Sequence, residues 1–320
     1  MRRLLGFMTL ACILSLPAHA QDFPTKAVTI IVPSSPGGIS DTGARIVAEG
    51  LSKLWDQPVV VENRPGGGGS IGTGIARRAQ PDGYTLLATT NGEFALNPVI
   101  YPNLPYDPNK DFAPLVLMTY NPIVIAVNTS APFQTYQELI AAAKKEPGSI
   151  SWSSAGTGTW NHLAGEWWQM ETGTKMVHVP YKGGSPAATA VAGGDVPVGL
   201  VSVSSIMPHV KSGKVKIIAV TSKEKSAYDT SWPTVAELGV PNLDAVNWVG
   251  LFAPTGIDPK VAKKIEADAI KVLQQPETRQ RFLGMGTEPV GMPSEGLAQK
   301  IKQDRAVAER VAKEANIRVN

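Results

Sequence analysis

Residues Val28 to Thr42 read VTIIVPSSPGGISDT, and this stretch decides the fold. It opens with an apolar, β-branched run, which suits a strand that is buried on both faces. Pro33 and the pair Gly37-Gly38 then break the run with a tight turn. Ser40 or Asp41 can cap the amphipathic helix that follows. Because unpaired amides and the positive end of the helix meet at the carboxyl end of such a strand, the stretch predicts a site for an anion, most naturally a carboxylate.

The first 20 residues have the pattern of a secretory signal peptide. Arg2 and Arg3 give a basic start, an apolar run follows, and Ala18-His19-Ala20 matches a cleavage site. The apolar run is too short to span a bilayer. We therefore expect an exported protein that is cleaved near Ala20. The only cysteine, Cys12, lies in this segment, so we expect no disulfide, thiol nucleophile or cysteine metal site in the mature chain.

The charge of the chain argues against large anionic partners. The 320 residues carry a formal net charge of +3, and loss of the two signal-peptide arginines leaves +1. This balance does not indicate binding to nucleic acid or to an anionic membrane surface. No later apolar run is long enough to span a bilayer. We expect a soluble protein whose ligand is a small molecule.

Strand and helix patterns alternate in two sets. Three strands near residues 28–32, 58–62 and 84–90 alternate with helices, and a second α/β set runs from Ile123 to Thr221. The alternation predicts parallel-rich sheets with helices on both faces. Between the sets, residues 97–114 are rich in proline and are expected to form an extended surface segment that leads to a strand at 115–120.

After the second set come an apolar strand at 248–253 and two long amphipathic helices, at 260–283 and 294–315. Helices without strands of their own must pack on an existing sheet, so we expect this part to return to the first domain. The predicted domains are residues 21–122 with 246–320, and residues 123–245. Two crossings join them, near Asn121-Pro122 and near Val246 to Gly250.

A glycine pattern, Gly67-x-Gly69-x-x-Gly72, follows the second strand and formally matches the dinucleotide fingerprint. The acidic residue that should bind the ribose is missing, because residues 86–91 read LLATTN. We therefore favour a structural turn over a nucleotide site, and we expect no cofactor.

The turn SSAGTGTWNH, residues 153–162, is another strand-to-helix junction and lies in the other domain. Thr157 and Thr159 add hydroxyl donors beside a helix N-terminus, and Gly158 allows close approach of the backbone. Together with the Gly37-Gly38 turn, it could hold a carboxylate from both sides; the alternative is a turn without a ligand. His162 suits a hydrogen-bond network on the first turn of the helix.

Residues 179–186, VPYKGGSP, form a fourth junction, where Tyr181 and Lys182 are candidate ligand contacts. Lys182 could hold a carboxylate, although a lysine near a turn is more often solvated. The candidate site also includes residues at the carboxyl ends of strands: Thr90, Asn91, Val201 and Ser202.

Patterns for catalysis or metal binding are weak. His162, His178 and His209 have no obvious catalytic partner in the sequence. His162 and Glu166 are one helical turn apart but lack a third metal ligand. An exported α/β enzyme that acts on a small carboxylated substrate remains the alternative to a binding protein, because a fold does not fix a function.

Eight stretches occur in the order and spacing of a known family: VPSSPGGISD, ENRPGGGGSIG, PDGYTLL, SSAGTGTWNHLAGE, VPYKGGSPAATAVAGGDV, PHVKSGKVKIIAV, PTVAELGVP and WVGLFAPTG. Together they resemble the solute receptors of tripartite tricarboxylate transporters, also called Bug proteins, from about Phe23 to the C-terminus. The resemblance implies a type II periplasmic binding protein fold, in which two α/β domains joined by two crossover segments close on a ligand. We expect a periplasmic monomer that delivers a small organic mono- or dicarboxylate to membrane permease subunits.

The resemblance also assigns site residues from both domains: Ser35, Gly37, Gly38, Asp41, Thr157, Gly158, Thr159 and His162. Family members often carry an aromatic residue where this chain has Ser34, and an acidic residue where it has Val201. Both positions lie where the distal part of the ligand is expected. The resemblance therefore implies a roomier, less polar end of the pocket and leaves the ligand unidentified.

Overall fold

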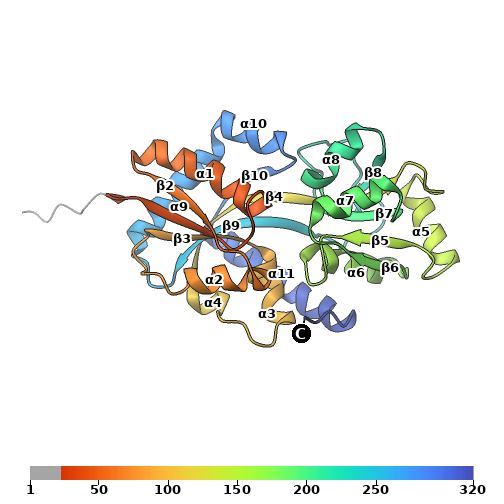
Figure 1. Cartoon of the computed structure of the whole chain (residues 1–320), viewed down its shortest axis with the longest axis horizontal. Helices are drawn as coiled ribbons and strands as arrows, with labels where there is room; N and C mark the ends of the chain where they lie inside the picture. Colours follow the sequence, from red (N-terminus) through yellow and green to blue (C-terminus); the bar gives the residue numbers. More distant parts are fainter. Residues whose placement is uncertain (1–22, 320) are drawn as a thin grey trace, which may run out of the picture.

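A computed structural model describes residues 23–319. The predicted signal peptide, its cleavage site near Ala20 and Cys12 lie outside the described residues. Figure 1 shows two lobes side by side, with strands β4 (Phe112–Asn128) and β9 (Val246–Pro254) running from one to the other. We call the lobe that contains residues 23–111 lobe A and the lobe that contains residues 129–245 lobe B.

Lobe A is built on a mixed sheet in the order β2-β1-β3-β9-β4, with β10 also paired to β4. β1 is parallel to β2 and β3, whereas the pairs that involve β9, β4 and β10 are antiparallel. The other elements of this lobe are β1 (Val28–Val32), β2 (Val59–Asn63), β3 (Thr85–Thr90), β10 (Glu288–Pro293), α1 (Ile39–Trp55), α2 (Ser70–Ala76), α9 (Pro259–Gln274) and α10 (Pro276–Gly284).

Lobe B is built on a second mixed sheet, in which β4 lies between β8 and β7, and β5 and β6 follow β7. Strands β7, β5 and β6 are parallel, so the expected parallel arrangement holds in the outer part of each sheet and not around β4. The elements are β5 (Ser151–Ser154), β6 (Val177–Pro180), β7 (Val198–Ser202), β8 (Val215–Val220), α5 (Tyr136–Lys145), α6 (Trp160–Thr172), α7 (Gly184–Gly193) and α8 (Val203–Lys211).

Strand β4 belongs to both sheets. Residues 112–122 pair with β9, and residues 123–128 pair with β7 and β8. The strand expected at 115–120 is therefore continuous with the start of the second set at Ile123, because pairing continues through the crossing. There Asn121 lies opposite Asn247, and Pro122 lies opposite Val246. The lobes are thus connected by a two-stranded ribbon rather than by two independent loops.

The core of lobe A fixes the position of the turn between β1 and α1. Ala44, Val47 and Leu51 lie on one face of α1 and are buried against β1, β3 and α9, as their helical spacing predicts. The two helices approach so closely that a Cβ at Gly50 would lie 2.3 Å from Val272 Cγ1. Because α1 is held in this way, its N-terminus has a fixed position beside β1.

Helix α11 (Ser294–Glu314) packs on both lobes. Its first half lies in an aromatic core of lobe A, where Leu297 and Ile301 join Trp248 and Phe252. Its second half joins the core of lobe B through Ala308, Val311 and Ala312. The C-terminal helix is therefore shared between the lobes, and the predicted domain boundaries near 122 and 246 stay a prediction.

Several elements differ from those expected. Residues 97–114 contain two short helices, α3 (Asn97–Ile100) and α4 (Pro108–Asp111), and Tyr106 between them is buried rather than on the surface. The helix expected at 260–283 is divided into α9 and α10, because Pro276 has no amide with which to continue α9. Strand β10 and helix α8 were not expected from the sequence.

Candidate functional site

A cavity of about 640 Å³ lies between the lobes, at the carboxyl ends of β1, β3, β5 and β7. Lobe A contributes the turn after β1 and a wall that runs from Thr90 to Tyr101. Lobe B contributes the turns after β5, β6 and β7, and β9 contributes Asn247. The cavity is therefore built from every glycine-bearing junction that the sequence singled out.

Four helices begin at this cavity. Residues at the N-termini of α1, α6, α7 and α8 all line it: Gly38–Ser40, Thr159–Asn161, Gly183–Ser185, and Ser202, Ser204 and Ser205. In α1, α7 and α8 no side chain caps the first amides. Each such terminus carries a partial positive charge of about half an elementary charge. The described residues that line the cavity include no lysine, arginine or histidine, so an anion would meet backbone amides, hydroxyls and helix ends.

Asp41 holds the turn between β1 and α1. Its Oδ2 accepts the amide of Gly37 at 2.8 Å, and its Oδ1 accepts Asn63 Nδ2 at 2.9 Å. Burial would raise the pKa of Asp41, but hydrogen bonds from Arg45, Gly37 and Asn63 lower it below its usual value. Asp41 is therefore a charged structural residue, and it engages the amide of Gly37, one of the predicted carboxylate donors.

The first unpaired amide of α1 belongs to Ile39, one residue after Gly38, which was the last backbone contact expected from the sequence. Gly38 is the N-cap residue of α1, so neither Ser40 nor Asp41 caps the helix. Within residues 23–319, the structure shows no hydrogen-bond acceptor for the amides of Ile39 and Ser40, and both residues line the cavity. These are the amides that a helix leaves unpaired at its start, and they are available to an anion.

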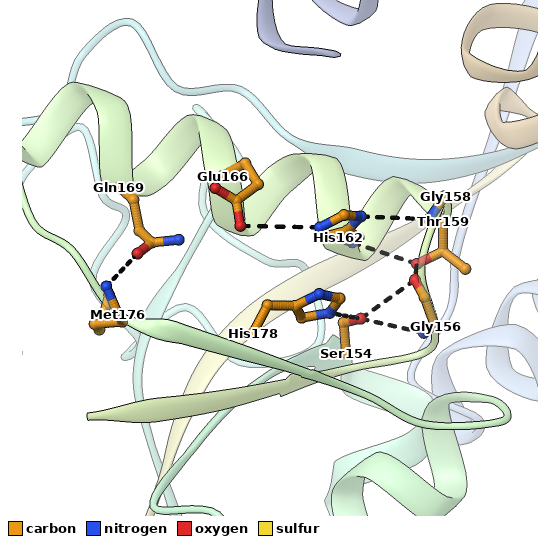
Figure 2. Close-up of polar contacts among 9 residues, drawn as sticks. All are labelled: Ser154, Gly156, Gly158, Thr159, His162, Glu166, Gln169, Met176 and His178. Carbon is orange, nitrogen blue, oxygen red and sulfur yellow. Dashed lines mark hydrogen bonds and ion pairs between the residues drawn. The ribbon is translucent and has the colours of Figure 1, made fainter. Parts of the chain in front are cut away.

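Figure 2 shows the hydrogen bonds that hold the turn between β5 and α6. Thr159 caps α6: its Oγ1 accepts the amide of His162 at 3.3 Å and donates to the Gly156 carbonyl at 2.7 Å. The amide of Gly158 donates to Nδ1 of His162 at 3.3 Å. His162 therefore fixes the turn and does not itself line the cavity.

His162 is stacked on His178 of β6, with ring centroids 4.0 Å apart and planes 11° apart (Figure 2). Nε2 of His178 lies 2.7 Å from Ser154 Oγ. Burial lowers the pKa of His162 to about 4, and burial and the neighbouring ring lower the pKa of His178 to about 3. Both rings are therefore neutral at pH 7, which allows Nδ1 of His162 to accept the Gly158 amide.

Nine predicted site residues line the cavity: Ser34, Ser35, Gly37, Gly38, Thr90, Thr157, Gly158, Thr159 and Ser202. They come from both lobes and from four separate segments of the chain. The structure brings these residues together around one space, and their contact with a ligand stays a prediction.

Six predicted residues do not line the cavity: Asp41, Asn91, His162, Tyr181, Lys182 and Val201. Asn91 is buried, and its Nδ2 donates to the Val246 carbonyl at 2.9 Å, which ties β3 to β9. Val201 belongs to the core of lobe B, and Tyr181 packs against that core. Lys182 is exposed on the surface.

Sequence reasoning missed several residues of the cavity. Asn247 Nδ2 lies 3.1 Å from Asn161 Oδ1 and 3.2 Å from Ser202 Oγ, so these three side chains join β9, α6 and β7 in one polar network. Glu93 also lines the cavity. The sequence pattern that could have pointed to it is the capping-box spacing Thr90-x-x-Glu93. Asn247 had no local signal, because its place depends on a strand pairing distant in the sequence.

Gly68 and Gly69 of the glycine-rich turn line the cavity, and the turn is held by the segment 97–101. A Cβ at Gly68 would lie 2.5 Å from the Tyr101 hydroxyl, and Asn97 Nδ2 donates to the Gly68 carbonyl at 2.8 Å. Between residues 23 and 319, the structure places no group of three or more His, Cys, Asp or Glu side chains where they could hold a metal ion. Over the same range, no helix has the length and apolar character needed to cross a membrane.

Comparison with known proteins identifies the family. The model of the tripartite tricarboxylate transporter family receptor matches residues 43–317. The chain belongs to this family. It is 33% identical over 278 residues to Protein BugT of Bordetella pertussis, a match that covers 87% of this chain and 85% of BugT.

Two solved structures show the same fold as this TctC-type receptor. A structure described as a periplasmic transporter is 38% identical, with a TM-score of 0.82 over 93% of this chain and 100% of that one. R. palustris Rpa4515 with adipate is 30% identical, with a TM-score of 0.83 over 93% of this chain and 99% of its own. The expected periplasmic binding protein fold is therefore confirmed. This chain is the periplasmic solute receptor of a tripartite transporter, and the alternative of an exported enzyme is set aside.

Proposed function

We propose that this receptor captures a small organic mono- or dicarboxylate in the cavity between its lobes. The observation that carries the proposal is the convergence of four helix N-termini on a cavity whose described lining has no basic side chain. Such a site favours a delocalised anion of modest size, because several neutral donors share the charge. The relative Rpa4515, whose structure is described as a complex with adipate, agrees with this ligand class.

The receptor then passes the solute to the permease subunits of its transporter. We further propose that it acts as a monomer, that its signal peptide is cleaved near Ala20, and that the lobes correspond to residues 21–122 with 246–320 and residues 123–245. The ligand contacts come from the cavity residues of both lobes, with the amides of Ile39 and Ser40 and the turn Thr157–Thr159 on opposite sides.

A thermal-shift panel of the mature protein tests the ligand class. The panel contains mono- and dicarboxylates of two to eight carbons, each with its neutral amide as the matched control. At a ligand concentration of about 100 times Kd, binding stabilises the folded state by about 2.7 kcal/mol, which raises Tm by several degrees. We expect this shift with at least one carboxylate and none with its amide. A panel without any carboxylate-specific shift would contradict the proposed function.

A further inference from the structure

Glu93 is the one acidic side chain among the described residues that line the cavity. It lies in the short π-helix Gly92–Leu96 that follows β3, on the wall contributed by lobe A. The chain makes room for it at Gly69, where an added Cβ would lie 2.5 Å from Glu93 Oε1. Gly69 also has a φ of +88°, which side chains rarely adopt. The position of Glu93 is therefore built into the fold.

The two carboxylate oxygens of Glu93 have different surroundings. Oε2 accepts the amide of Thr90 at 3.1 Å and also the Thr90 hydroxyl. Within residues 23–319, Oε1 has no hydrogen-bond donor, yet it is not among the side-chain oxygens that are sealed from accessible space. Because the side chain lines the cavity, Oε1 can accept a hydrogen bond from a molecule inside it.

The hydrogen bonds of the local turn satisfy only one of the two carboxylate oxygens of Glu93. Thr90 and Glu93 close a local turn, in which Oε2 of Glu93 accepts the Thr90 amide and Thr90 Oγ1 accepts the Gly92 amide at 3.1 Å. A glutamine could accept the same bonds from Thr90 through its amide oxygen. Burial raises the pKa of Glu93, while the bonds from Thr90, together with its own nearby amide and the nearby Thr89 hydroxyl, act to lower it. The protein satisfies only one oxygen of this carboxylate, so the other is open to water or to a donor group of the solute.

We propose that Glu93 binds a hydrogen-bond donor on the solute, so that the natural ligand is an amino- or hydroxy-substituted carboxylate rather than an unsubstituted one. An ammonium group suits the site best, because it pairs with the charge of Glu93 while the helix ends hold the carboxylate of the same molecule. An unsubstituted dicarboxylate would bring a second negative charge near Glu93 instead. This inference rests on the proposed function and narrows it to a solute class.

Isothermal titration calorimetry with two matched series tests the inference. The first series is succinate, malate and aspartate, which differ only in carrying hydrogen, hydroxyl or ammonium at one carbon; the second is adipate and 2-aminoadipate. In the wild-type protein we expect the amino acid to bind at least tenfold more tightly than the unsubstituted acid in the series that fits the cavity, with malate between aspartate and succinate. In Glu93→Gln we expect this preference to disappear, with the unsubstituted acid bound as tightly as before or more tightly.

Glu62→Gln is the matched control, because Glu62 is a partly exposed residue of β2 that pairs with Arg64 outside the cavity. It should leave the preference unchanged. The order of affinities in the wild-type protein tests the inference even if Glu93→Gln does not fold. An unsubstituted acid that binds as tightly as its amino derivative, or a preference that persists in Glu93→Gln, overturns the role of Glu93. Failure of every acid to bind the wild-type protein would instead overturn the proposed function.

Discussion

Thr159 and Lys182 show, at the scale of single residues, two different ways to hold a carboxylate. Thr159 lines the cavity and caps α6, whereas Lys182 is exposed and outside the lining. If backbone amides and helix ends hold the charge, Thr159→Ala should weaken ligand binding by roughly tenfold to a hundredfold, or on the order of 1–3 kcal/mol. The variant loses the bonds to Gly156 and His162 that hold the turn whose amides face the cavity. Lys182→Ala should change the affinity by less than about threefold. Calorimetric titration of both variants with the acid that gives the largest thermal shift measures the difference.

Loss of the Thr159 cap should also lower the free energy of unfolding by about 1 kcal/mol, so thermal unfolding of both free variants serves as the control. A silent Thr159→Ala together with a loss of binding in a folded Lys182→Ala would mean that an ion pair anchors the ligand. That result would refute the assignment of the carboxylate to helix ends.

The sequence was enough to predict those site residues whose positions are set by their neighbours in the chain. Gly38 and Thr159 stand directly before helices, and Thr157 lies in the same turn as Thr159, so strand, turn and helix patterns were enough to place them at a cavity. Asp41 and His162 were also expected to contact the ligand, but each bonds an amide of its own turn. Which face of the turn such a side chain takes depends on tertiary packing, and no local pattern records it.

The stacked histidines act at the scale of elements, because they join α6 to β6 beneath the ligand turn. Histidine in an unfolded chain has a pKa near 6.5, and the folded values lie at about 4 and about 3. Between these values the unfolded chain binds more protons than the folded protein, so stability is complete above about pH 6.5 and falls as the pH is lowered toward 4. Unfolding near pH 5 should therefore take up about two protons from this pair.

Urea unfolding measured from pH 8 to pH 4 tests this prediction. The double variant His162→Gln, His178→Gln should lose most of the decline in stability below pH 6.5, whereas His209→Gln on α8, away from the pair, should keep it. Burial raises the pKa of nearby Glu166, which acts in the opposite sense and makes the observed decline smaller. An equal decline in the double variant and in wild type would show that other groups govern the acid response.

Elements with strong local sequence patterns lie where they were predicted, whereas elements that depend on distant partners were not predicted. β1 and α1 have continuous apolar spacing and lie where expected. β10 contains Pro289 and Gly291 and exists as a strand because β4 pairs with it across more than 150 residues of sequence. α8 has Ser204 and Ser205 in its first turn and contains Pro208, so its residues carry little intrinsic preference for a helix.

At the scale of the whole molecule, the ribbon of β4 and β9 sets how the lobes can move. Its two strands are paired at the crossing, so we expect the lobes to rotate by bending of this ribbon when ligand enters. Ile71 and Lys182 are exposed on opposite lobes, and the described chain has no cysteine to interfere with labelling. Dyes on Ile71→Cys and Lys182→Cys should move closer together at saturating ligand.

A second pair of dyes, on Ile71→Cys and Val60→Cys, lies within lobe A and should keep its distance, because both exposed positions belong to the same lobe. Energy transfer between the dyes in single molecules measures both pairs. No change in the Ile71–Lys182 distance at saturation would count against closure of the lobes.

Helix α11 carries the end of the described chain to the ligand turn. The amide of Val319 donates to the Ile100 carbonyl at 3.3 Å, and a Cβ at Gly158 would lie 2.9 Å from Val319 Cγ2. Anything fused after this point therefore begins beside the turn that we assign to ligand binding. For engineering, a fluorescent reporter attached at Val319 would be positioned to sense the solute directly.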